Sequence, residues 1–134
     1  MSKLERIVSA IAIASMLVAV AATPSHAAGK KHARSQAYDG LWSVSIRTQV
    51  GPCDASYRYP ARIVGGIIRQ ADSDLSYQVS GAVVSSGAIM VTVSKGLGIA
   101  TGYGRLRGAT GYGRWSTAGN QCYGTWSAMR RVSN

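Results

Sequence analysis

Polar and apolar side chains alternate along residues 38–131, in short segments that end at clusters of turn residues. In the first segment Trp42, Val44 and Ile46 alternate with polar residues, and a period of two places successive side chains on opposite faces of a β-strand. Beyond Ala22 no segment has the period that an amphipathic helix requires. The chain is therefore expected to fold as all-β structure.

Glycine, proline and polar turns divide this region into about eight short strands, at the spacing typical of antiparallel all-β domains. The strands are expected near residues 42–46, 57–64, 67–69, 75–81, 89–94, 97–107, 110–117 and 121–131. Consecutive hairpins of this kind form an up-and-down meander. Because closure removes exposed strand edges, we predict a closed barrel, with a two-sheet β-sandwich as the alternative.

Residues 1–27 have the pattern of a secretory signal peptide. The basic residues Lys3 and Arg6 precede an apolar run over 7–22, and Ala27 ends a stretch with small residues at the cleavage positions. The run is shorter than the roughly twenty residues that span a bilayer. Cleavage after Ala27 predicts a periplasmic or secreted protein.

The remaining residues are enough for one domain of ordinary size. The apolar content of the whole chain, 46%, is typical of a folded unit and excludes a disordered one. Residues 28–37 are polar and basic, and we expect them to form a flexible N-terminal arm in front of a β-barrel domain over 38–134.

The charged residues are strongly unbalanced. The full chain has 15 Lys and Arg against 5 Asp and Glu, and loss of residues 1–27 removes two bases and one acid, which lowers the net charge from +10 to +9. No glutamate then remains and His32 is the single histidine, while the carboxylates are those of Asp39, Asp54, Asp72 and Asp74. Paired-carboxylate catalysis, a histidine triad or a metal centre would need more of these groups. We therefore expect no enzyme, no catalytic residue, no metal and no cofactor.

The excess of basic residues predicts either an anionic partner or simply a well-solvated exterior. Nucleic acid is compatible with this charge, but it is not an expected partner for an exported protein. An anionic polysaccharide or another polyanion of the cell envelope fits both the charge and the compartment.

Cys53 and Cys122 are the two cysteines of the chain. In an oxidising compartment they are expected to form a disulfide, which would tie the end of the first strand to the last strand. The alternative is two reactive thiols, which would lack both a Cys-x-x-Cys spacing and a neighbouring histidine.

The motif Thr-Gly-Tyr-Gly-Arg occurs at 101–105 and again at 110–114, with a degenerate copy at 123–126. A two-residue turn at Gly108-Ala109 would pair the two copies as antiparallel strands. Tyrosine and arginine would then alternate on one face of the hairpin, and glycine and tryptophan would lie on the other.

The Tyr and Arg face is the candidate binding surface, and it consists of Tyr103, Arg105, Tyr112, Arg114 and Tyr123. Tyrosine rings stack on sugars or bases, and guanidinium groups bind phosphate or carboxylate. The alternative is that both residue types only fill an exposed strand. A related feature is Arg62, which is expected to face Arg69 across the Gly65-Gly66 turn, because such a like-charge pair is unfavourable unless an anion bridges it.

The opposite face of the hairpin combines glycine with Trp115 and Trp126. Small residues leave room for indole rings in a narrow barrel, so we expect a packed interior that also contains Trp42. The alternative is a cavity lined by Trp and Gly that holds a small apolar ligand.

Gly40-Leu41-Trp42 opens the first strand, and Arg130-Arg131 ends the last. This combination resembles the calycin-type barrels, which include lipocalins, avidins and small bacterial periplasmic metalloprotease inhibitors. The resemblance implies that Trp42 lies at one end of the barrel beneath Arg130 or Arg131. The segments 38–44 and 122–126 also resemble small exported proteins of alphaproteobacteria, a resemblance that implies no activity.

Together these observations favour a non-enzymatic, exported β-barrel that binds an anionic polymer or surface glycan. One alternative is a periplasmic protease inhibitor of the small-barrel type, in which residues 28–37 would enter the cleft of the protease. Another is a carrier of a small apolar ligand inside the barrel.

Overall fold

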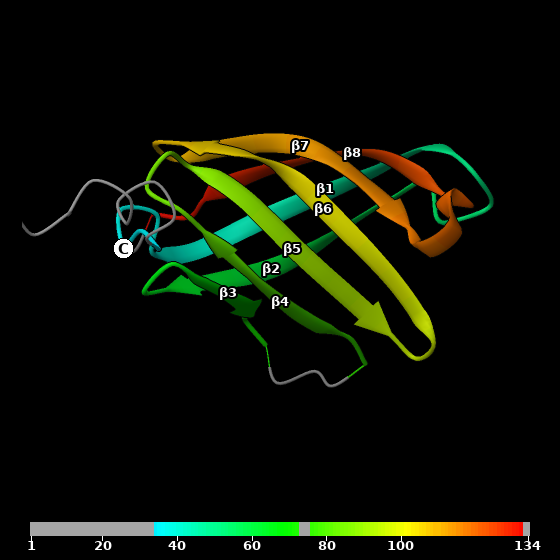
Figure 1. Ribbon diagram of the computed structural model, residues 1–134, viewed down its shortest axis with the longest axis horizontal. Coiled ribbons are helices and arrows are strands. Elements are labelled where there is room, and N and C mark those ends of the chain that lie inside the picture. Colours follow the sequence, from blue (N-terminus) through cyan, green and yellow to red (C-terminus); the bar gives the residue numbers. More distant parts are fainter. Residues whose placement is uncertain (1–33, 73–75, 133–134) are drawn as a thin grey trace, which may run out of the picture.

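The computed structural model describes residues 34–72 and 76–132 of the chain. The predicted signal peptide, the first part of the predicted arm with His32, and Asp74 lie outside the described residues. The eight strands are β1 (Gly40–Val50), β2 (Ser56–Val64), β3 (Ile67–Gln70), β4 (Gln78–Val83), β5 (Ala88–Lys95), β6 (Gly98–Arg107), β7 (Thr110–Thr117) and β8 (Tyr123–Arg130) (Figure 1). A short 3-10 helix, η1 (Ala118–Asn120), connects β7 to β8.

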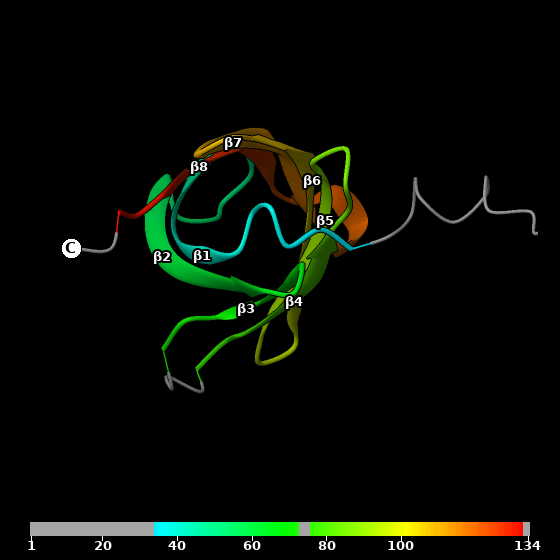
Figure 2. The ribbon, with the colours of Figure 1, turned by 90° about the vertical axis from the view of Figure 1, so that its left-hand side faces the viewer.

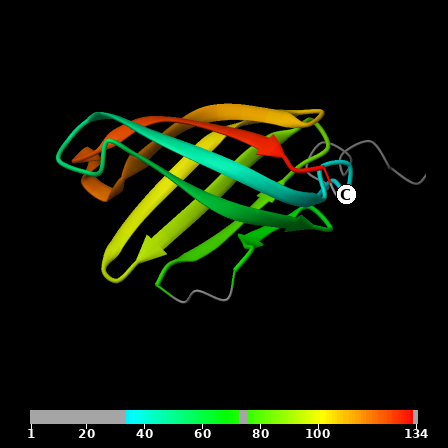
Figure 3. The ribbon, with the colours of Figure 1, turned by 180° about the vertical axis from the view of Figure 1, so that it is seen from behind.

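The strands form a closed antiparallel barrel in which sequence order is also spatial order. β1 pairs with β2 on one side and with β8 on the other, which completes the ring. Figure 2 shows this ring nearly end-on, and Figure 3 shows β1 and β8 side by side. The prediction of an up-and-down barrel is confirmed, and the sandwich alternative is excluded.

Glycine sets the tight turns at which the chain reverses. Val64 pairs with Ile67, so Gly65-Gly66 is a two-residue turn, and both glycines have positive φ, at 59° and 74°. L-residues with a side chain rarely adopt that conformation, which explains the glycines here. The sequence placed the turn after β5 at Lys95-Gly96, but Lys95 pairs with Gly98, so the turn is formed by Gly96 and Leu97.

The hairpin of the repeat has the predicted register. Arg107 pairs with Thr110, which leaves Gly108-Ala109 as the turn, and Gly104 pairs with Gly113. Glycine allows the Trp126 ring to lie flat against the wall, because a Cβ at Gly113 would lie only 2.7 Å from its Nε1 atom. The Trp126 Nε1 also donates a hydrogen bond to the carbonyl of Tyr103 at 3.0 Å.

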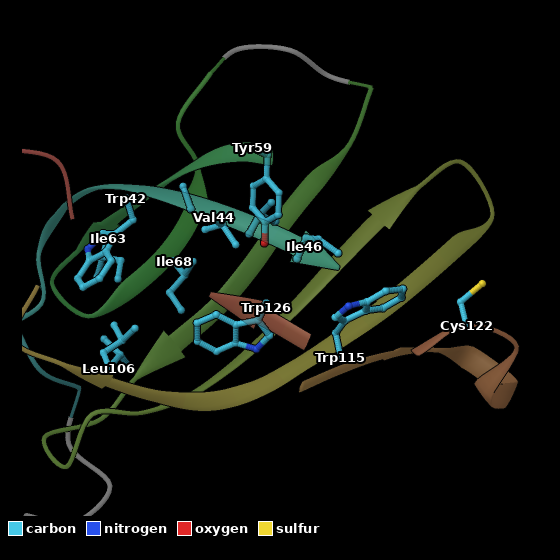
Figure 4. Close-up of a cluster of buried hydrophobic side chains, with 13 residues drawn as sticks. Trp42, Val44, Ile46, Tyr59, Ile63, Ile68, Leu106, Trp115, Cys122 and Trp126 are labelled. Atoms are coloured by element: carbon cyan, nitrogen blue, oxygen red, sulfur yellow. The ribbon is translucent and has the colours of Figure 1, made fainter. Parts of the chain in front are cut away.

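The barrel interior is apolar and is filled mainly by large side chains (Figure 4). The indoles of Trp42, Trp115 and Trp126 are all at least nine-tenths buried, as predicted. The described part of the chain buries no polar or charged residue in this core. Burial of this apolar surface is the main force that stabilises the barrel.

One end of the barrel is closed by the residues that precede β1. Ser35 N donates to the carbonyl of Val83, and the two carboxylate oxygens of Asp39 accept hydrogen bonds from the Gly65 and Gly66 amides. In Figure 2 this cyan segment crosses the near end of the ring. The structure thus differs from the predicted flexible arm over residues 34–37, because their backbone groups are paired with the barrel, a feature that polar composition does not reveal.

The disulfide joins Cys53, in the loop after β1, to Cys122, immediately before β8, as predicted. Cys122 is 1% exposed, and its sulfur also accepts a hydrogen bond from Cys53 N at 3.2 Å. The bond therefore links β1 and β8, the two strands whose pairing closes the barrel, at the end opposite to the Asp39 contacts.

Candidate binding surface

The Tyr/Arg surface, defined as Tyr103, Arg105, Tyr112, Arg114 and Tyr123, lies on the outer wall of β6, β7 and β8. The three tyrosines are 55%, 65% and 43% exposed in chain order. Both arginines are exposed as well. The alternating strand pattern produces this arrangement, because the residues between them face the tryptophan-filled interior.

Cross-strand pairing brings four of these residues into a checkerboard. Tyr103 is directly opposite Arg114, and Arg105 is directly opposite Tyr112. Directly opposite side chains in antiparallel strands have Cβ atoms about 5 Å apart. Tyr123 lies on the adjacent strand, diagonal to Arg114, since Arg114 pairs with Thr125. All five predicted residues therefore share one continuous outer surface.

The tyrosine rings and the guanidinium groups of this surface are not stacked on one another. The cation–π contact that forms within the described part of the chain is between Arg130 and Trp42, at the closed end of the barrel, and not on this surface. The side-chain hydrogen bonds of the described residues also leave the guanidiniums of Arg105 and Arg114 without a protein acceptor. The donors and ring faces of the Tyr/Arg surface are therefore open to a ligand.

The charge of the wall is of one sign only. None of the strands that the structure describes contains Asp or Glu. Their outward-facing cations are Arg47, Arg58, Arg62, Arg69, Lys95, Arg105, Arg107 and Arg114. Cations without a carboxylate between them give the outer wall a positive potential.

Arg47 extends the Tyr/Arg surface, although the sequence analysis did not select it. It pairs with Thr125 of β8, which in turn pairs with Arg114 of β7, so the three residues form one row across the barrel. The carbonyl of Arg47 also accepts a hydrogen bond from the Trp115 indole at 3.0 Å. Alternation within 40–50 predicts that Arg47 faces outward, but its position beside this surface depends on the pairing of the first and last strands.

The barrel-closing residues predicted from the resemblance, Trp42, Arg130 and Arg131, lie together at the closed end. Trp42 pairs with Arg130, whose guanidinium lies over the indole ring at 5.5 Å from its centroid. Arg131 instead donates from Nε to the Ser43 hydroxyl at 2.9 Å on the outer side. The arginine that covers Trp42 is therefore Arg130.

The interior retains a small apolar cavity of about 70 Å³, lined by the tryptophans and by apolar side chains of β1, β2, β3, β5, β6 and β8. An apolar cavity of about 150 Å³ is known to admit benzene, so this space is too small for most organic ligands. The structure therefore favours the packed interior over the carrier alternative.

Three tyrosines lie at the other end of the barrel. Tyr59 is 5.9 Å from Tyr57 and 6.0 Å from Tyr77, measured between ring centroids. Figure 4 shows the Tyr59 hydroxyl directed into the interior. Burial, and then repulsion from Tyr57 and Tyr77, raises the pKa of the Tyr59 phenol above its usual value of 10.0.

Residues 34–72 and 76–132 contain no group of three His, Cys, Asp or Glu side chains close enough to hold a metal ion. Within the same ranges, no helix is long and apolar enough to cross a membrane. No protein-family model, curated protein or solved structure matches the chain.

Proposed function

We propose that this protein is a non-enzymatic binding module for an acidic polysaccharide, and that the ligand lies on the Tyr/Arg surface. The single observation that carries the proposal is the checkerboard of exposed tyrosines and arginines, whose side chains are not stacked on one another, on strands without carboxylates. An exported protein that meets anionic polymers of the cell envelope would have this combination of features.

The two residue types have different roles in the proposal. Each guanidinium offers a planar set of donors that can bind a carboxylate or sulfate group through two hydrogen bonds. The exposed rings of Tyr103 and Tyr112 offer flat apolar faces that can stack on sugar rings. Each tyrosine ring is directly opposite a guanidinium group, so stacking contacts alternate with charged contacts along the surface. This alternation suits a polymer with one anionic group on each sugar.

Salt dependence tests the electrostatic part of this proposal. Exposed charges are screened over about 8 Å at physiological ionic strength and about 3 Å at 1 M salt. We expect the affinity for a polyuronate to fall by about tenfold or more between 50 mM and 500 mM sodium chloride, measured by calorimetry, and uncharged dextran to show no binding. An affinity for polyuronate that is unchanged by salt would contradict the proposal.

Paired substitutions test the location of the site. Arg105→Gln with Arg114→Gln should weaken polyuronate binding by about tenfold or more, since two charge-assisted contacts are removed. The matched control is Arg58→Gln with Lys95→Gln, which removes the same charge from positions whose cross-strand partners are Ser45 and Gly98. Equal losses in the two variants would show that only net charge matters and would overturn the assignment of the surface.

The tyrosines require a separate test that leaves charge unchanged. Tyr103→Ser with Tyr112→Ser should weaken polyuronate binding by several-fold at every salt concentration, because stacking is not screened by ions. The same variant should have the same affinity for a short DNA duplex as the unmodified protein, because the substitutions leave the charge unchanged. Polyuronate binding that does not change in this variant would contradict the stacking role and favour a general polyanion site.

The inhibitor alternative receives less support from the fold. Residues 34–37 of the predicted arm pair with the barrel, so a reactive arm would consist of residues 28–33, which lie outside the described residues. Removal of residues 28–33 alone would test inhibition without disturbing the closed end of the barrel.

A further inference from the structure

A second cluster of cations lies on the wall formed by β2 and β3. Arg62 and Arg69 are directly opposite each other in the antiparallel pair, and both are exposed. Opposite positions bring two Cβ atoms to about 5 Å, and like charges in such positions are destabilising. The fold therefore places two exposed arginines at directly opposite positions, an unfavourable arrangement that a bound anion would relieve.

The neighbours of this pair do not neutralise it. Arg62 is flanked on β1 by Leu41, and Arg69 is flanked on β4 by Ser80. Asp72, three residues after Arg69, forms no ion pair with either arginine within the described part of the chain. Asp39 holds the Gly65 and Gly66 amides with both oxygens. Neither guanidinium donates a hydrogen bond to any residue among those that the structure describes. An anionic group that bridges the two arginines would remove their repulsion and satisfy their donors.

The position of the pair relative to the Tyr/Arg surface follows from the strand order. In a closed ring of eight strands, three strand spacings separate the β2–β3 pair from the β6–β7 pair in either direction. Figure 2 shows β7 and β3 on opposite sides of the barrel. At about 4.8 Å between neighbouring strands, three spacings correspond to about 14 Å of curved wall. A saccharide of one or two units that lies on one pair of strands is too short to reach the other pair around that wall.

From this arrangement we propose that Arg62 and Arg69 form a second anion-binding site, which makes the protein bivalent and lets it crosslink two chains of the same acidic polysaccharide. The inference rests on the proposed function, because it takes the ligand class from the Tyr/Arg surface. None of the residues that pair between β2 and β3 is aromatic. The Arg62–Arg69 site therefore binds through charge alone, and its affinity is lower and more sensitive to salt than that of the Tyr/Arg surface.

The experiment uses two probes, a uronic acid trisaccharide and the long polyuronate. Backbone amide signals of the protein are followed by NMR during titration with the trisaccharide, and light scattering is followed during titration with the polymer. The variant Arg62→Gln with Arg69→Gln is compared with the control Arg58→Gln with Lys95→Gln, which has the same net charge. Loss of like-charge repulsion means that the first variant should fold at least as stably as the unmodified protein.

The bivalent protein is expected to show trisaccharide-dependent shifts on both β2–β3 and β6–β7, and to raise the light scattering of the polymer at intermediate ratios. Arg62→Gln with Arg69→Gln should lose the β2–β3 shifts and the increase in scattering, while its trisaccharide affinity at β6–β7 changes by less than about twofold. The control should retain the shifts and the scattering, because it has the same net charge as this variant but keeps Arg62 and Arg69.

Two other outcomes separate the inference from the proposed function. Shifts confined to β6–β7, with polymer binding but no scattering, would overturn bivalency and leave the Tyr/Arg surface intact. Shifts confined to β2–β3 would instead overturn the proposed function at the Tyr/Arg surface, and with it the crosslinking of two chains.

Discussion

The guanidinium of Arg130 lies 5.5 Å from the centroid of the Trp42 ring, and the two residues are paired across β8 and β1. The same guanidinium donates to the carbonyls of Ala37 at 3.0 Å and Asp39 at 3.2 Å. The Trp42 indole in turn donates to the carbonyl of Tyr38 at 2.9 Å. This pair therefore connects the first strand, the last strand and the segment that closes the barrel.

Arg130→Met should lower the free energy of unfolding by about 2–4 kcal/mol. The change removes a cation–π contact worth roughly 0.5–2 kcal/mol and hydrogen bonds from a charged donor worth roughly 1.5–3 kcal/mol, which overlap in one side chain. Urea denaturation followed by tryptophan fluorescence measures the loss. The control Arg131→Met removes an exposed bond to Ser43 and should cost less than about 1 kcal/mol. Similar losses in both variants would mean that the contact with Trp42 contributes little.

Gly113→Ala tests the close approach of Trp126 to the wall. A Cβ at this position would overlap the carbonyl oxygen of Tyr103 and lie 2.7 Å from Trp126 Nε1, so β6 or the indole must move. We expect a loss of about 2 kcal/mol or more and a weaker near-ultraviolet circular dichroism signal. The control Gly98→Ala meets only the Lys95 carbonyl, at 3.3 Å, and should leave both measurements nearly unchanged. A normal near-ultraviolet spectrum for Gly113→Ala would show that the ring is not held by this approach.

The orientation of the candidate surface could be predicted from sequence because it depends on local rules. Alternation assigned Tyr103 and Arg105 to the outside, and the Gly108-Ala109 turn fixed the register that places them opposite Arg114 and Tyr112. In a hairpin, the turn length determines every pair above it. Two adjacent segments of sequence therefore contained enough information for the checkerboard.

Features that depend on contacts between distant segments could not be predicted in this way. Arg47 joins the row of Arg114 only because β1 pairs with β8. Likewise, residues 34–37 have a polar composition typical of a tail, yet they pair through backbone groups and through Arg130. Backbone hydrogen bonds are available to any sequence, so composition carries no signal for them.

The disulfide should contribute most of its effect through the unfolded chain. Closing a loop of the 69-residue separation between Cys53 and Cys122 reduces the entropy of the unfolded state by an amount worth about 4 kcal/mol in the chain-entropy model. Replacement of both cysteines by alanine should lower the urea midpoint accordingly and leave the far-ultraviolet spectrum unchanged. A reducing agent should lower the urea midpoint of the unmodified protein by the same amount and leave that of the double variant unchanged. This result would identify the disulfide as the cause. A double variant as stable as the unmodified protein would contradict this account.

The buried phenol of Tyr59 predicts a loss of stability in alkaline solution. Its pKa is raised above 10.0 in the folded protein by burial, whereas the unfolded chain ionises near 10.0. The folded state therefore binds more protons above that pH, and the stabilisation present below pH 10 is lost as the pH rises toward the folded-state pKa. The decline can reach about 1.4 kcal/mol for each pH unit above 10.

Tyr59→Phe should flatten this decline, because phenylalanine keeps the buried ring and has no proton to lose. Urea denaturation at several values between pH 8 and pH 11.5 gives the slope for each variant. Tyr103→Phe is the matched control, since that ring is 55% exposed and its substitution should leave the slope as it is in the unmodified protein. Equal slopes in Tyr59→Phe and in the unmodified protein would show that folding does not raise the pKa of the Tyr59 phenol. The barrel would then have to open to water at its tyrosine-lined end.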